Sequence, residues 1–107
     1  MLFKNISPTE LNEKLQTKQN FRLIDVREPE EFALAELGGA EQLPLSRFDS
    51  WVNNLAPSEE IVVVCHHGVR SAAVCRYLAT NGFEKIFNLT GGIDAWSTEV
   101  DRRVPRY

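Results

Sequence analysis

The chain has 107 residues, of which 43% are hydrophobic and 25% are charged, and its formal net charge at pH 7 is -3. This length and balance predict one globular domain over residues 1–107 with a single modest core. The small negative charge and the lack of a long basic block argue against nucleic acid as a partner, and no apolar run reaches the roughly 18 residues that a membrane span needs.

The N-terminal residues and the two cysteines indicate the cellular compartment in which the protein is expected. Residues 1–5 lack the hydrophobic stretch of a signal peptide, so a cytoplasmic location is expected. Two cysteines are too few for a disulfide scaffold, and a reducing compartment would keep a reactive thiol available.

The first predicted elements are a short strand over residues 2–4 and a helix. Residues 7–10 read Ser-Pro-Thr-Glu, which places an N-cap serine, a proline at the first helical position and a glutamate three residues after the cap. Leu11 and Leu15 then repeat at helical spacing. This pattern predicts a helix that runs to about residue 17.

A second strand and a second helix follow. Residues 21–26 are mostly apolar, as a strand covered on both faces requires, and Asp25 and Arg27 lie at its carboxyl end. Residues 29–34 open with proline and two acids, which predicts a short helix whose first turn complements the helix dipole. Two glycines at positions 38 and 39 then predict a turn.

The rest of the chain continues the alternation of strands and helices. The expected order is a strand over residues 40–43, a helix over 47–55, a strand over 61–64, a helix after 71, a strand over 85–89, a turn over 90–92 and a final helix from 93. About five strands interleaved with helices predict an α/β fold, a mainly parallel sheet flanked by helices on both faces.

The apolar run over residues 61–64 leads directly to Cys65 and a short polar loop. The run is entirely β-branched, which is typical of a buried parallel strand, and a helix-like segment follows Ser71. Ligands bind at the carboxyl ends of such strands, where a helix N-terminus offers free N–H groups and partial positive charge. With Arg70 nearby, this position favours the thiolate, which is the nucleophilic form of cysteine.

Three separated stretches, residues 25–32, 65–71 and 89–96, carry a common pattern. Together with residues 39–40 (Gly-Ala) and 43–45 (Leu-Pro-Leu), they make the chain resemble a single-domain rhodanese over nearly its whole length. The resemblance implies a rhodanese-like α/β domain without a cofactor. It also implies a sulfurtransferase whose catalytic cysteine takes sulfane sulfur from a donor, holds it as a persulfide and passes it to a nucleophilic acceptor.

By match of motif, the resemblance implies that Cys65 is the catalytic residue. The backbone N–H groups of residues 66–70 are expected to converge on its sulfur, and Gly68 is expected to take a positive φ that lets the loop curl. Arg70 would either face a bound anion or anchor the loop to a carboxylate. The expected active-site and substrate-binding loop consists of His66, His67, Gly68, Val69, Arg70 and Ser71.

Several other residues leave two interpretations open. Asp25 and Arg27 form either a structural ion pair beside the site or a direct substrate contact. Cys75, inside an apolar helical run, is expected to be structural, with a resolving thiol as the alternative. No metal is predicted, because adjacent histidines point in different directions and the cysteine spacing lacks a zinc pattern. Gly91 and Gly92 predict a turn rather than a phosphate cradle.

The leading functional prediction is transfer of sulfane sulfur from thiosulfate or a persulfide to a thiol, cyanide or protein acceptor, through a persulfide on Cys65. Two alternatives stay open: a sulfur relay or regulatory module with little thiosulfate activity, and a phosphatase-like or arsenate reductase-like cysteine enzyme. Proteins of similar fold with those oxyanion activities have a cysteine loop that is one residue longer. The shorter loop from Cys65 to Arg70 suits a single sulfur atom better.

Overall fold

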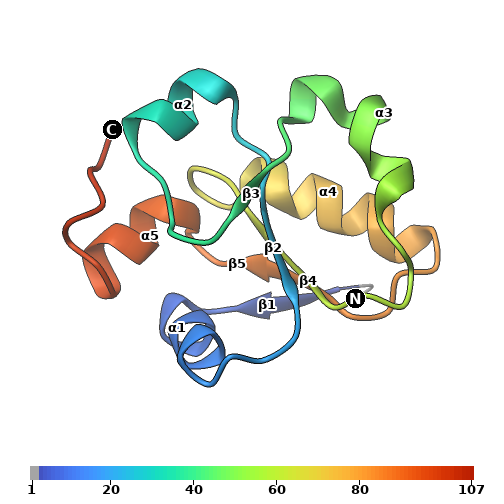
Figure 1. Cartoon of the computed structure of the whole chain (residues 1–107), viewed down its shortest axis with the longest axis horizontal. Coiled ribbons are helices and arrows are strands. Elements are labelled where there is room, and N and C mark those ends of the chain that lie inside the picture. Colours follow the sequence, from blue (N-terminus) through green and yellow to red (C-terminus); the bar gives the residue numbers. More distant parts are fainter. Residues whose placement is uncertain (1–2) are drawn as a thin grey trace.

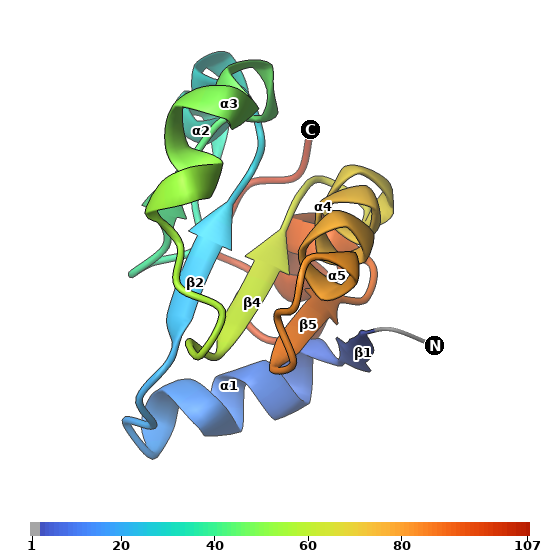
Figure 2. The same ribbon diagram turned by 90° about the vertical axis from the view of Figure 1, so that its right-hand side faces the viewer.

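Five strands form one parallel sheet in the computed structural model, which describes residues 3–107. Each neighbouring pair in the sheet runs parallel, and Figure 2 shows β2, β4 and β5 pointing the same way. The predicted α/β fold is therefore confirmed. Across the sheet the strands are β1 (Lys4–Ile6), β5 (Ile86–Leu89), β4 (Ile61–Val64), β2 (Arg22–Asp25) and β3 (Glu41–Gln42).

Helices cover both faces of the sheet, as Figure 1 shows. One face packs against α1 (Pro8–Gln16) and α5 (Gly92–Glu99), and the other against α3 (Phe48–Trp51) and α4 (Val69–Thr80). A further short helix, α2 (Pro29–Leu34), follows β2. Within residues 3–107, no helix combines the length and the apolar character that crossing a membrane requires.

Strand β4 packs into a hydrophobic core on each face of the sheet, and this packing determines the position of Cys65. Its four side chains are fully buried and alternate: Ile61 and Val63 enter the core under α3 and α4, whereas Val62 and Val64 enter the core under α1 and α5. Burial of each such side chain stabilises the fold by about 1.5–3 kcal/mol. A slip of one residue would exchange the two sets, so the register is strongly specified and Cys65 falls on the α3/α4 face.

The start of the chain differs partly from expectation. The strand predicted over residues 2–4 begins at Lys4, and Leu2 lies outside the described residues. The predicted capping box of α1 is confirmed: the N–H of Glu10 donates to Ser7 Oγ at 3.1 Å, and the N–H of Ser7 donates to Glu10 Oε1 at 2.9 Å. Such a cap stabilises a helix by about 1 kcal/mol.

The single helix predicted over residues 47–55 is wrong. The structure has three short pieces there: a 3₁₀ turn at Leu45–Arg47, then α3, then a second 3₁₀ turn at Val52–Asn54. This segment is rich in serine, asparagine and aspartate, whose side chains bond to nearby backbone and compete with a regular helix. The hydroxyl of Ser50, for example, donates to the carbonyl of Arg47 at 2.6 Å.

Candidate functional site

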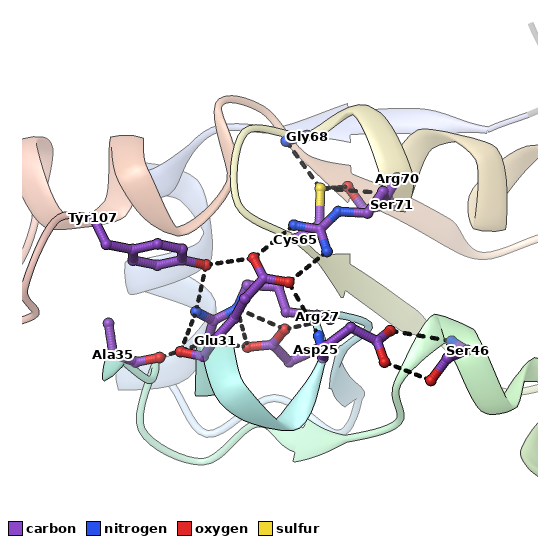
Figure 3. Close-up of polar contacts among 11 residues, drawn as sticks. Asp25, Arg27, Glu31, Ala35, Ser46, Cys65, Gly68, Arg70, Ser71 and Tyr107 are labelled. Carbon is purple, nitrogen blue, oxygen red and sulfur yellow. Dashed lines mark hydrogen bonds and ion pairs between the residues drawn. The ribbon is translucent and has the colours of Figure 1, made fainter. Parts of the chain in front are cut away.

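Cys65 lies between the carboxyl end of β4 and the N-terminus of α4, with its side chain buried. Figure 3 shows its sulfur facing the loop that follows. The N–H of Gly68 donates to Sγ at 3.1 Å and the N–H of Ser71 at 3.3 Å. Two backbone donors aimed at one sulfur stabilise negative charge on it.

The cysteine loop is shorter than expected. Residues 66–70 were expected to form it, but α4 begins at Val69, so Val69 and Arg70 belong to the first turn of the helix. The cause is Gly68, whose φ of +99° turns the chain into the helix, as its predicted positive φ required. The side chain of Val69 is largely exposed at this end of α4, and its role in the site stays a prediction.

Ser71 and Asn88 form a buried hydrogen-bond network next to the Cys65 sulfur. Ser71 Oγ lies 3.2 Å from Cys65 Sγ and 2.5 Å from Asn88 Oδ1, and Asn88 Nδ2 donates to the carbonyl of Gly68 at 3.2 Å. Because Asn88 Nδ2 donates to a carbonyl, Oδ1 faces the Ser71 hydroxyl and accepts a hydrogen bond from it. When Cys65 ionises, that hydroxyl can turn and donate to the sulfur instead.

Asn88 is a site residue that was not predicted from the sequence. The signal was present, since asparagine is a polar residue inside the otherwise apolar strand β5 and is buried there. A buried side-chain amide needs hydrogen-bond partners, so its presence in such a strand marks a local polar site.

Helix α5 holds the cysteine loop from the other side. The N–H of Ile93 donates to the carbonyl of Cys65 at 2.9 Å, and the N–H of Asp94 donates to that of His66 at 3.1 Å. Gly92 makes this approach feasible: it has φ +61°, and a Cβ there would lie 2.4 Å from each of these two carbonyl oxygens. The glycine pair predicted as a simple turn is therefore also a packing surface for the loop.

Arg70 anchors the loop to a carboxylate, which is one of the two roles left open by the sequence. Its Nη1 donates to Glu31 Oε1 at 2.6 Å and its Nη2 donates to Oε2 at 2.8 Å, as Figure 3 shows. Glu31 comes from α2, where it also accepts the N–H of Glu28 at 3.2 Å. The hydrogen bonds from Arg70, followed by that from Tyr107, lower the pKa of Glu31 from 4.5 to about 2.

This lowered pKa predicts that the Glu31–Arg70 pair makes the fold acid-sensitive. A pKa that is lower in the folded state stabilises the fold fully above pH 4.5, and this contribution is lost as the pH falls towards 2. Wild type should exceed Glu31→Gln in free energy of unfolding by about 1 kcal/mol near neutral pH, with the gap closing in acid. Urea unfolding of wild type and Glu31→Gln from neutral pH down to about pH 2 measures this difference in free energy. A difference that does not change with pH would contradict the prediction.

Tyr107 is a second residue of the site that was not predicted from the sequence. Its ring stacks on His66 with centroids 3.9 Å apart and planes at 9°. Its hydroxyl accepts from Arg27 Nη1 at 2.9 Å and donates to Glu31 Oε2 at 2.8 Å (Figure 3). These contacts join the tail that follows α5 to α2 and to the cysteine loop. No local pattern signals them, because Tyr107 and Glu31 are 76 positions apart.

The two histidines stack on each other, so the expectation that they point in different directions is wrong. Their ring centroids are 3.9 Å apart with planes at 27°, and burial, together with the charge of His67, lowers the pKa of His66. Their nitrogens and a carboxylate oxygen of Asp94 lie within 4.8 Å of one another. Arg106, however, donates to both oxygens of Asp94, at 2.8 and 3.2 Å. The absence of a metal stays a prediction.

Asp25 and Arg27 have the contacts of a structural ion pair. Both side chains are fully buried, and Arg27 Nη2 lies 2.7 Å from Asp25 Oδ2. Arg27 also donates to the carbonyl of Ala35 at 2.6 Å and to that of Glu31 at 3.2 Å (Figure 3). The pair thereby connects the end of β2 to a carbonyl inside α2 and to another just after its C-terminus, and α2 is the helix that carries the partner of Arg70.

Cys75 lies in the apolar core under α4, where burial raises the pKa of its thiol to about 12. We expect iodoacetamide at about pH 8 to leave Cys75 unmodified in the native protein and to alkylate it after unfolding in urea, because the thiolate is the reactive form. Peptide mapping by mass spectrometry locates the label. Rapid native labelling of Cys75 would instead support the resolving-thiol alternative.

The architecture and the site together define a class of protein: a parallel α/β domain with a thiol held by backbone N–H groups at the end of its central strand. A family model described as a rhodanese-like domain matches residues 7–99. The chain belongs to the rhodanese-like domain family, which confirms the resemblance found in its motifs.

Individual relatives agree with this assignment. The chain is 39% identical over 97% of its length to "Rhodanese-like/PpiC domain-containing protein 12, chloroplastic" of Arabidopsis thaliana, but spans only 37% of that protein. It is 36% identical to "Putative sulfurtransferase YtwF" of Bacillus subtilis, covering 94% of this chain and 96% of that protein. The crystal structure of a rhodanese-like domain protein from Staphylococcus aureus has a TM-score of 0.82 at 32% identity, covering 98% of this chain and 99% of that one.

Proposed function

We propose that the protein is a sulfurtransferase that carries sulfane sulfur as a persulfide on Cys65. The observation that carries the proposal is a buried sulfur that accepts two backbone N–H groups, those of Gly68 and Ser71, with the Ser71 hydroxyl 3.2 Å away. The relationship to a Bacillus subtilis protein whose name contains sulfurtransferase supports the same activity. The proposed donors are thiosulfate or a persulfide, and the proposed acceptors are a thiol, cyanide or another protein.

The chemistry needs no cofactor and no net oxidation. The Cys65 thiolate attacks the sulfane sulfur of the donor, a new sulfur–sulfur bond forms, and the donor's own bond breaks. The leaving group, sulfite from thiosulfate or a thiolate from a persulfide, departs with the bonding electron pair. The acceptor then attacks the outer sulfur of the persulfide, and the Cys65 thiolate leaves in turn. The loop donors stabilise the anionic sulfur in each state.

Two further features support this assignment. Cys65 and Cys75 are both free thiols, and a reducing compartment such as the cytoplasm would preserve them. Phosphatase-like or arsenate reductase-like chemistry finds less support, because Arg70, the arginine that would face a tetrahedral oxyanion, is held by Glu31. The pairing of Arg70 with Glu31 also favours a sulfur relay with little thiosulfate activity as the second candidate.

The experiment mixes the reduced protein separately with thiosulfate and with a small-molecule persulfide and measures intact mass. We expect a gain of one sulfur atom from at least one donor, and we expect cyanide to remove it as thiocyanate. Loading from a persulfide but not from thiosulfate would favour the relay. If neither donor adds sulfur, the proposed function is wrong.

A further inference from the structure

Within residues 3–107, three arginines that contact the site are each paired with a carboxylate. Each arginine is bonded to its acid through two of its nitrogens. Of the two stacked histidines, His66 has its pKa lowered by burial and by the charge of His67. Among residues 3–107 the pairs are Arg27–Asp25, Arg70–Glu31 and Arg106–Asp94.

Of the three acids, Glu31 has the most direct effect on the charge near the Cys65 thiol, because its partner is Arg70. It neutralises Arg70, which directly precedes Ser71, the residue whose N–H donates to the reacting sulfur at 3.3 Å. The charge of Cys65 is one of the causes that raise the pKa of Arg70. Donors from Arg70, Tyr107 and the backbone of Glu28 fix the Glu31 carboxylate. A carboxylate held by this many donors stays ionised and in place.

The charge of the sulfur donor then determines how strongly the donor is repelled as it approaches the Cys65 thiolate. Thiosulfate is a dianion that must meet a thiolate, and because Glu31 cancels the charge of Arg70, this arginine does not compensate that repulsion. A persulfide of an uncharged thiol brings at most one negative charge. Building on the proposed function, we propose that Glu31 is a specificity-determining residue that disfavours thiosulfate and selects persulfides as sulfur donors.

The test compares the rates at which two donors load sulfur onto Cys65, measured by intact mass. The donors are thiosulfate and the persulfide of N-acetylcysteamine, an uncharged thiol. The proteins are wild type, Glu31→Gln, and Glu30→Gln as a control that removes the same charge from the same helix at an exposed position. Glutamine keeps an oxygen that can accept the N–H of Glu28, so the start of α2 is preserved.

We expect Glu31→Gln to raise the ratio of the thiosulfate rate to the persulfide rate about tenfold, because it uncovers the charge of Arg70. Glu30→Gln should leave the ratio as in wild type. Adding Arg70→Gln to Glu31→Gln should return the ratio to about that of wild type, since the pair then carries no net charge in either protein. An unchanged ratio in Glu31→Gln, or a gain that survives without Arg70, overturns the inference.

Ionic strength provides a second measurement that needs no variant. In wild type the thiosulfate rate should rise with added salt, because screening weakens a net repulsion. A falling rate would mean that a free cation attracts the dianion, and it would contradict the neutralisation of Arg70. Failure of both donors to load any protein would refute the proposed function itself. Loading with unaltered donor preference would refute only the role of Glu31.

Discussion

Replacing Cys65 by serine should abolish sulfur loading from every donor, a loss of more than about 10⁴-fold relative to wild type. The hydroxyl oxygen cannot form a persulfide, and at neutral pH it is not ionised as a thiolate is. Serine is close in size to cysteine and can accept the N–H groups of Gly68 and Ser71 that now bond to Sγ. The fold should therefore persist, which circular dichroism and urea unfolding would check.

The matched control is Cys75→Ala, which removes the other thiol of the chain. Cys75 is fully buried in the apolar core under α4, so its loss should cost modest stability and leave loading at the wild-type rate. Intact mass after incubation with thiosulfate or a persulfide measures both variants. Sulfur uptake by Cys65→Ser, or its disappearance in Cys75→Ala, would assign the carrier to Cys75 and contradict the proposed mechanism.

The parts of the fold that sequence predicted well depend on local signals. The capping box before α1 specifies its own helix start, because both partners lie within one turn. Strand β4 is likewise readable, since a β-branched run that is buried on both faces has little alternative to a central parallel strand. The helix predicted over residues 47–55 failed because side chains there compete locally for backbone partners.

The parts of the candidate site that sequence did not predict depend on long-range contacts. Glu31 was recognised only as an acid in a helix start, and nothing near it in the sequence indicates that it faces Arg70, 39 positions away. Tyr107 meets His66 and Glu31 only after the tail has crossed the carboxyl edge of the sheet. Contacts between such distant segments follow from strand order and helix placement, which motif spacing does not encode.

Gly92 shows how a residue read as a turn can shape a site through space. Its missing side chain lets the first turn of α5 approach the carbonyl groups of Cys65 and His66, which accept the N–H groups of Ile93 and Asp94. Those two hydrogen bonds hold the backbone of the loop that also carries the Gly68 donor to Sγ. The position of the sulfur thus depends on a glycine from a different strand–helix unit.

Gly92→Ala should consequently be among the most damaging single substitutions in the chain. A left-handed φ of +61° strains any residue with a side chain, and the new Cβ would lie 2.4 Å from two carbonyl oxygens of the backbone. Strain and overpacking together should lower the free energy of unfolding by about 4 kcal/mol. Displacement of the loop should also slow sulfur loading onto Cys65 in the fraction that remains folded.

Gly82→Ala separates the two causes, because Gly82 has φ +92° but no atom within 4 Å of an added Cβ. It should lower the free energy of unfolding by only about 1 kcal/mol, the cost of the left-handed backbone alone, and leave sulfur loading as in wild type. Urea unfolding and intact-mass loading of both variants measure the difference. Equal losses of stability would mean that backbone strain explains both substitutions. A larger loss at Gly92, accompanied by slower loading, would identify the close contact between α5 and the cysteine loop as the feature that holds the sulfur in place.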